Sequence, residues 1–501
     1  MLASLALALM ASAPPAQIHS AASLVQTTTS PAEGSRSEAE IAIARYMETF
    51  YRAEFADALK AAESLKVDPS NRQGLGMVTG MRAAALLGLK RKNQADRLYQ
   101  EAIALNPQEP MTVHLRMMAA LMIEDGPVAL TAFDRLVARF PDEVRDIDPE
   151  IMWFVFQKED SKDMSAKEDR RIALARLGYG GDTYGDFITA SAIRVLIRRG
   201  DISGATDLLR YLDEPTDIED LLIQKRYAAL WPALELHAGT KLAKVRLSSA
   251  ESAKRAYEAD STNWRELAQY VDALRHAGRA NEAIALREKL PSTPEAMANM
   301  EEWTGWTFNN IAYALHSEGR GDEADQLFAT LNQAKIENSG WRVSMVINRL
   351  EMLVADQKYD RALALMDTTE ATAKRDGNPY SQQLVRRLRY CSLIKLGRAA
   401  EAAHVRPEMM KNKDKSIGAT IEGLLCAGEH DEAEKLALSL LDTEDGEGSF
   451  VRNLQVKPLT GDDPSVWATG WSVLRQRPAI AKEFERLGRD LPEHLYGSAG
   501  R

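Results

Sequence analysis

Apolar residues recur along most of the chain with the spacing of one face of an α-helix, and one arrangement repeats. In the first copy, relative positions 0, 4, 7 and 12 hold Ala95, Tyr99, Ala102 and Pro107. Thirty-four residues later the same positions hold Ala129, Phe133, Leu136 and Pro141. The first three positions share a helix face, and proline ends a helix. A small first residue lets the preceding helix approach, and an aromatic second residue fills the space between the helices. The pattern therefore predicts helical hairpins that pack on one another.

The small first residue anchors further copies of this pattern. The nine anchors are Ala58, Ala95, Ala129, Ala205, Ala283, Ala324, Ala362, Ala402 and Ala433. Neighbouring anchors lie 31 to 41 residues apart, except for two separations of 76 and 78 residues, each with room for one degenerate helix pair. Repeats of this length indicate stacked supersecondary units. We expect an all-α fold, an α-solenoid of antiparallel helix pairs.

The series closely resembles the tetratricopeptide repeat, whose second helix has alanine, an aromatic residue, alanine and proline in this order. The family also has a glycine five residues before the first alanine, as Gly319 stands before Ala324 in EGRGDEADQLFATL. The family's first-helix tryptophan and glycine are mostly replaced here, and the terminal proline disappears after Pro141. The resemblance implies a tetratricopeptide-like superhelix of bacterial type, with a concave surface that binds other proteins.

A glycine-rich stretch, RLGYGGDTYGDF at 176–187, falls in the first long separation. It lacks the third glycine of a dinucleotide-binding loop, and no strand is expected before it. Helices are expected instead near PEIMWFVFQK and SAKEDRRIALARL, and again from about Phe187. We interpret the stretch as a connector in which a left-handed glycine ends a helix.

Composition divides the chain into five segments. They are a signal peptide at 1–22, a flexible leader at 23–38, the repeat array at 39–441, a polar loop at 442–463, and C-terminal capping helices with a tail at 464–501. The capping segment WSVLRQRPAIAKEFERLGRDLP is amphipathic and broken at Pro478. An array of repeats needs such an atypical last unit to cover its terminal apolar face.

The apolar run MLASLALALMASAPPAQ contains the small-x-small sequence Ala11-Ser12-Ala13 of a signal-peptidase site. No Lys or Arg precedes Arg36, however, and Pro14 is a poor residue to follow a cut. The run is also too short to span a bilayer. We expect a periplasmic or secreted protein without an integral membrane segment, or a cytoplasmic one if the run is not a signal.

Composition and charge narrow the functional classes. Hydrophobic residues are 45% and charged residues 27%, which suits a chain with a packed core. The net charge is −10 and basic residues are scattered, so a nucleic-acid partner is not expected. The motifs of zinc proteases, α/β-hydrolases and phosphate-binding loops are absent, and His430-Asp431-Glu432 reads as an ordinary helix start. We expect no catalysis, no cofactor and no metal.

The two cysteines, Cys391 and Cys426, are too few for a disulfide framework or a four-cysteine metal site. They fall on neighbouring helices of the expected register. Two interpretations stay open: buried thiols, or a disulfide formed in an oxidising compartment.

The resemblance also implies which side chains line the concave groove. An apolar set on one first helix consists of Met111, Met118 and Met122, together with His114. An aromatic and polar set consists of Trp306, Asn309, Tyr313 and His316, and the helices on either side add Arg265, Asp272, Arg275, Arg387 and Lys395. Methionine suits adaptable contacts, and Trp, Tyr and Arg are enriched in binding hot spots. The alternative is that the methionines form a core stripe and that Trp306 packs between repeats.

These features favour a non-catalytic scaffold or adaptor of the bacterial cell envelope, which binds a protein or peptide partner in the groove. Two alternatives remain. The first is an enzyme in which separated acids and histidines meet in the groove. The second is an RNA-binding helical-repeat protein, which the acidic charge disfavours.

Overall fold

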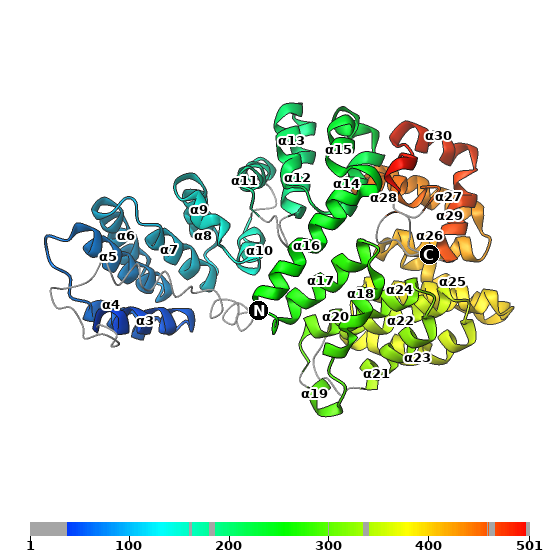
Figure 1. Ribbon diagram of the computed structural model, residues 1–501, viewed down its shortest axis with the longest axis horizontal. Coiled ribbons are helices and arrows are strands. Elements are labelled where there is room, and N and C mark those ends of the chain that lie inside the picture. Colours follow the sequence, from blue (N-terminus) through cyan, green and yellow to red (C-terminus); the bar gives the residue numbers. More distant parts are fainter. Residues whose placement is uncertain are drawn as a thin grey trace. The chain divides into compact units, whose positions relative to one another are not determined.

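The protein is built from α-helices, shown in Figure 1 for a computed structural model of the chain. The structure describes residues 38–159, 163–179, 186–298, 300–333, 340–457, 459 and 466–496. In these ranges the only β-type pairing is one isolated bridge between Gln224 and Gly488. The chain forms two compact units, residues 1–195 and 196–501, and the division falls inside helix α12 (Asp186–Arg198).

The first unit consists mainly of helix pairs in which a helix packs against its sequence neighbour. Its helices before α12 are α3 (Glu38–Tyr51), α4 (Phe55–Ser64), α5 (Arg72–Gly88), α6 (Lys92–Leu105), α7 (Pro110–Met122), α8 (Gly126–Arg139), α9 (Pro141–Arg145), α10 (Pro149–Gln157) and α11 (Met164–Arg176). The first helices of successive pairs also contact each other, as α5 contacts α7. This approach is close because α5 presents Gly80 to Thr112 of α7, where a Cβ atom would lie 2.3 Å from the threonine hydroxyl.

The second unit also contains helix pairs, with short 3-10 helices between several of its elements. Its helices are α13 (Ile202–Leu208), α14 (Pro215–Ile223), α15 (Trp231–Ala238), α16 (Ala243–Ala259), α17 (Trp264–His276), α18 (Ala280–Ala285), α19 (Pro294–Ala298), α20 (Glu302–Ser317), α21 (Gly321–Gln333), α22 (Arg342–Ala355), α23 (Tyr359–Asp376), α24 (Pro379–Lys395), α25 (Ala399–Lys411), α26 (Ile417–Cys426), α27 (His430–Ser439), α28 (Glu444–Asn453), α29 (Val466–Arg475) and α30 (Pro478–Leu487). Consecutive first helices, α17, α20, α22, α24 and α26, contact one another along the stack.

The turn within each helix pair has the same backbone conformation. The residue five positions before every anchor has a positive φ, and these residues are Ala53, Lys90, Glu124, Gly200, Gly278, Gly319, Gln357, Gly397 and Gly428. A left-handed residue lets the next backbone N–H bond to the helix that has just ended. In one case, Arg320 N–H donates to the Leu315 carbonyl at 2.9 Å. The repeat register predicted from the sequence is thereby confirmed, including the copies that have lost the glycine.

The anchoring alanines are buried as the spacing predicts. All nine are at most 1% exposed, so no larger side chain has room between the two helices of a pair. The aromatic residues of the pattern are buried beside them, with Phe133 at 0%, Phe328 at 1% and Tyr99 at 6% exposure. The all-α fold of antiparallel helix pairs is therefore confirmed.

The first long separation between anchors contains α10 and α11, and α12 begins at Asp186, as expected from the sequence. Gly178, which follows α11, has φ of 69° and ends the helix in the left-handed conformation. Residues 180–185 of the glycine-rich connector lie outside the described residues, as do the predicted signal peptide at 1–22 and almost all of the leader at 23–38.

The segment predicted as a polar loop, 442–463, contains a helix. α28 begins after Thr443, whose side chain accepts a hydrogen bond from Gly446 N–H, and three acidic residues occupy its first turn. Phe450 and Val451 are buried, at 0% and 1% exposure. The polar composition concealed this helix because its apolar face is only two residues wide. The capping helices after it, α29 and α30, begin near the predicted positions, and Pro478 is the first residue of α30.

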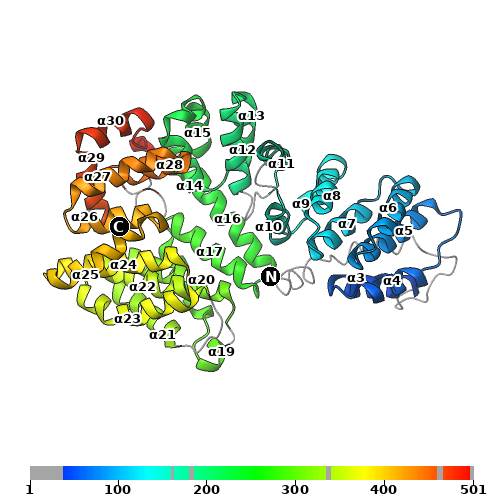
Figure 2. The same cartoon turned by 180° about the vertical axis from the view of Figure 1, so that it is seen from behind.

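The C-terminal helices of the second unit return to its beginning. Figures 1 and 2 show α28 beside α14, although more than 200 residues separate them in the chain. Arg452 on α28 donates to Asp220 on α14 at 2.9 Å. Arg489 N–H, after α30, donates to the Ile223 carbonyl at 2.8 Å, and its guanidinium lies 3.6 Å from the ring centre of Trp231. The array in this unit is therefore closed on itself rather than open at both ends.

Candidate interaction surface

Two neighbouring first helices of the second unit, α17 and α20, bring together aromatic and arginine side chains. This aromatic-arginine surface consists of Arg265, Arg275, Trp303, Trp306 and Tyr313, all half-buried. The Arg265 guanidinium lies 5.7 Å from the ring centre of Trp303, and that of Arg275 lies 5.4 Å from the ring centre of Tyr313. Cation–π contacts of this length link the two helices near both of their ends.

The aromatic-arginine surface rests on a well-packed base. Trp306 and Tyr313 pack against a cluster of buried residues that includes Phe308, Ile311 and Leu315. The indole N–H of Trp306 donates to the Glu302 carboxylate at 3.1 Å, one turn earlier on α20. The Trp306 ring is therefore held in one orientation by its own helix and by the core beneath it.

Polar side chains fix the spacing of the helices that carry the surface. Asn310 donates to the Ala268 carbonyl of α17 at 3.1 Å. On α17 itself, Arg275 donates to Asp272 at 3.0 Å. Burial alone would raise the pKa of Asp272, but His276 and Arg275 hold it below its usual value. Asp272 is therefore charged at neutral pH and orients Arg275.

Two other predicted groove residues, Asn309 and His316, form hydrogen bonds to the neighbouring repeat instead of facing a groove. Asn309 is 4% exposed and accepts a hydrogen bond from Asn348 of α22 at 2.9 Å. His316 lies 2.8 Å from Asp356, just after α22, and Lys358 donates to the same carboxylate at 3.0 Å. Burial would raise the pKa of Asp356, but hydrogen bonds from Lys358 and His316 keep it below its usual value. Both residues connect one repeat to the next.

The structure places Arg387 away from any binding surface. It is 5% exposed and forms ion pairs with Glu351 of α22 and Glu422 of α26. Burial raises the pKa of Glu422, and the nearby Glu351 adds to this effect, while Arg387 opposes it. Arg387 therefore joins three consecutive first helices. The sequence could not show this, because the two carboxylates come from other repeats, about 36 residues away on either side.

The predicted apolar set lies on α7 in the first unit and is divided by the fold. Met118 is fully buried, at 0% exposure. It therefore belongs to the core between the helices. Met111, His114 and Met122 are half-buried. Burial lowers the pKa of His114 to about 4, so this side chain is neutral at physiological pH. Only Met111 and Met122 of the three methionines offer surface to a partner.

The two cysteines form a disulfide bond between α24 and α26. Their Cα atoms are 5.5 Å apart, in the usual range for a disulfide. Cys391 and Cys426 each lie four residues after a member of the buried ion pair, Arg387 and Glu422. The two helices are therefore joined at successive turns by an ion pair and then by a covalent bond.

The described residues form neither a metal-binding cluster nor a membrane-spanning helix. In the described ranges, no group of three or more His, Cys, Asp or Glu side chains could hold a metal ion. No described helix combines the length and apolar composition needed to cross a lipid bilayer. The surface on α17 and α20 offers aromatic faces and guanidinium donors, which suit non-covalent binding of another chain.

Sequence reasoning missed two members of this region, Trp303 and Asn310. A signal was available for both, because Trp303, Trp306, Asn310 and Tyr313 follow one another at spacings of three or four residues. This places them on a single face of α20. The resemblance had instead pointed to Asn309, the residue directly before Asn310, whose side chain faces α22.

No known protein family matches the chain, and no curated protein matches it by sequence. Several solved structures align with the chain at low similarity. Yeast Tom70 is 12% identical with a TM-score of 0.30, and the match covers 90% of this chain and 100% of Tom70. The Naa15/Naa10 complex bound to HypK-THB is 11% identical with a TM-score of 0.25, and the match covers 88% of this chain and 78% of that one. The TPR domain of P58(IPK) is 12% identical with a TM-score of 0.19, and the match covers 89% of this chain and 98% of that one. TM-scores this low carry no inference about fold or function.

Proposed function

We propose that the protein is a non-catalytic interaction scaffold that binds a segment of another protein on the aromatic-arginine surface of α17 and α20. The observation that carries the proposal is the pairing of half-buried aromatic rings with guanidinium groups on two adjacent helices. Trp, Tyr and Arg are the side chains that most often dominate binding energy in interfaces. Apolar side chains of the partner would pack on the rings, and its carboxylates or carbonyl oxygens would accept hydrogen bonds from the arginines.

We also propose that the scaffold acts in the bacterial cell envelope. The disulfide between Cys391 and Cys426 supports this location, because disulfides persist in oxidising compartments and are rare in the cytosol. The apolar run at the N-terminus supports it as well. Sequencing of the N-terminus of the protein purified from its own cells tests the proposal, since an exported chain would begin after that run.

The binding proposal is tested with the double variant Trp306→Ala and Tyr313→Ala. Full-length tagged protein is crosslinked in its own cells, purified, and the retained proteins are compared with those held by the wild type. We expect loss of at least one specific partner, because each truncated hot-spot residue typically costs ~2 kcal/mol or more of binding. The far-ultraviolet circular dichroism should be unchanged, since both side chains are only half-buried.

A matched control is Tyr380→Ala on α24, an aromatic residue that is 53% exposed and lies outside the aromatic-arginine surface. This variant should retain every partner. If the control and the double variant lose the same proteins, or if the double variant unfolds, the surface is not a specific binding site.

A further inference from the structure

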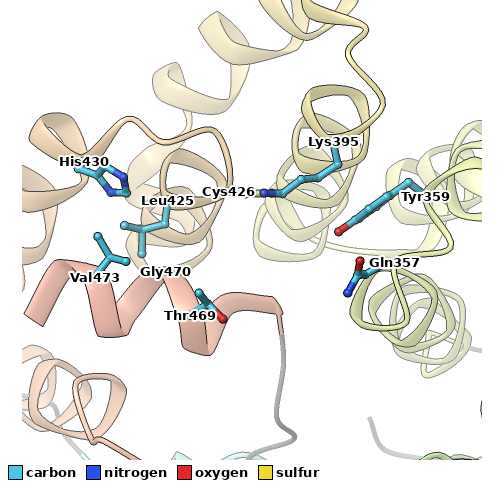
Figure 3. A pocket seen from close by; sticks show the side chains of 9 residues that line it. All are labelled: Gln357, Tyr359, Lys395, Leu425, Cys426, His430, Thr469, Gly470 and Val473. Carbon is cyan, nitrogen blue, oxygen red and sulfur yellow. The ribbon is translucent and has the colours of Figure 1, made fainter.

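The second unit contains a cavity that is separate from the aromatic-arginine surface. Its volume is about 470 Å³, which is in the range of small-molecule sites. Figure 3 shows that its walls come from four places in the fold: the α22–α23 turn, the end of α24, the α26–α27 turn and helix α29. The C-terminal helix α29 therefore completes a cavity that the repeats alone would leave open.

One end of the cavity offers hydrogen-bond donors. Lys395 and Tyr359 reach towards its middle from α24 and α23, and Gln357 lies beside Tyr359 (Figure 3). In the described part of the chain, the Lys395 ammonium has no ion-pair partner. Burial raises the pKa of Tyr359, so its hydroxyl keeps its proton at neutral pH. Among the described residues that line the cavity there is no Asp or Glu, although the chain carries a net charge of −10.

The other end of the cavity is largely apolar. Leu425, Val473 and the Cα of Gly470 form this end, and Figure 3 shows His430 next to them. The Nδ1 atom of His430 is buried and has no hydrogen-bond partner among the described residues. Apart from this one imidazole nitrogen, the described side chains at this end therefore offer mainly apolar contacts.

We propose that this cavity binds a small amphiphilic carboxylate, a carboxyl group carried on a short apolar chain or ring. The carboxylate accepts hydrogen bonds from the Lys395 ammonium and the Tyr359 hydroxyl, and the apolar part packs between Leu425 and Val473. A carboxylate suits this end because charge-assisted hydrogen bonds to an ammonium are the strong ones. Cys426, whose disulfide joins α24 to α26, also lines the cavity and fixes the relative position of these two walls.

The test uses 4-phenylbutyrate as the probe and isothermal titration calorimetry on the full-length protein. The isosteric neutral amide, 4-phenylbutyramide, serves as the ligand control. We expect saturable one-to-one binding of the acid and at least tenfold weaker binding of the amide. Equal affinity for both compounds, or no saturable binding of the acid, would overturn the proposal.

Two variants test the two ends of the cavity separately. Lys395→Met removes the charge from an exposed side chain. It should weaken binding of the acid at least tenfold without weakening binding of the amide. Val473→Trp fills the apolar end from a position that is 41% exposed, and should abolish binding of both compounds. Lys435→Met on α27, outside the cavity and paired with Glu432 at 3.5 Å, is the matched control and should bind as the wild type does. Wild-type affinity in both cavity variants would place the probe elsewhere and overturn the proposal.

The C-terminal residue of a peptide can also present a carboxylate together with an apolar side chain. The tripeptide Gly-Gly-Phe and its C-terminal amide are therefore titrated in parallel. Tighter binding of the tripeptide than of 4-phenylbutyrate, with dependence on Lys395, would assign the site to a protein chain end, and the reverse order would assign it to a free small molecule.

Discussion

The substitution Arg387→Met tests whether the buried ion-pair network is structural. It leaves Glu351 and Glu422 without their shared arginine, and removal of one partner of a buried ion pair typically costs about 3–5 kcal/mol. The side chains of Glu351 and Glu422 are 27% and 17% exposed, so water still reaches both carboxylates. The lower end of the range, about 3 kcal/mol, is therefore expected. At about 2 °C per kcal/mol for a unit of this size, the melting temperature should fall by roughly 6 °C.

The assay is thermal unfolding followed by circular dichroism, with Arg389→Met as the control on the same helix. Arg389 pairs with Asp367 and Glu370, whose side chains are 90% and 31% exposed, so both acids stay solvated without it and its removal should cost about 1 kcal/mol or less. Adding Glu422→Gln to Arg387→Met should recover more than half of the loss. A loss in Arg387→Met no larger than in the control, or no recovery in the double variant, would refute this reasoning.

The network also predicts how the loss depends on pH. Burial and the nearby Glu351 raise the pKa of Glu422 in the folded protein, and Arg387→Met removes the group that opposes this rise. An acid with a raised folded-state pKa contributes stability that is fully present below its unfolded value, about 4.3, and is lost as the pH rises through its folded value. The difference in the free energy of unfolding between Arg387→Met and the wild type should therefore shrink as the pH falls from 7 towards 4.5. A difference that is constant over this range would contradict the assignment.

Three further predictions concern the framework. Replacing both cysteines with alanine should lower the free energy of unfolding by about 4 kcal/mol, because the disulfide closes a loop of 35 residues; denaturant unfolding of the wild type should respond to reductant, and that of the variant should not. Ala283→Leu should destabilise by about 1–3 kcal/mol through overpacking, whereas Ala285→Leu on the exposed face of the same helix should be nearly neutral in thermal unfolding. Gly319→Ala should cost about 1 kcal/mol in denaturant unfolding from backbone strain alone, because φ is 73° and nothing lies within 4 Å of the new Cβ atom; an equal cost in Gly418→Ala, which has no positive φ, would contradict this.

The repeat register was predictable because it depends on local spacing. A small residue, an aromatic residue and a left-handed turn are all set within about ten residues of each other. This information survives even where single positions have drifted, as at Lys90 and Gln357, which have a positive φ without being glycine. The nine anchors could therefore be placed from the sequence, although the helix in the polar segment 442–463 could not.

The side-chain partners could not be predicted because they come from other repeats. Nothing near Arg387 in the sequence identifies Glu351 or Glu422 as its partners, and Met118 differs from Met122 only in the direction it faces on α7. The disulfide was an open alternative for the same reason, since the separation of Cys391 and Cys426 depends on how α24 packs on α26. Burial and pairing between repeats are properties of the stack and not of the single hairpin.

The contact between α28 and α14 constrains how the second unit can change in length. In an open array, one more helix pair can be inserted or deleted because each pair contacts only its neighbours. Here an inserted pair would move α28 and the Arg452 side chain away from Asp220, and would break the bonds that Arg489 makes to Ile223 and Trp231. The number of repeats between α14 and α28 is thus fixed by geometry, so the second unit can vary by substitution but not by duplication.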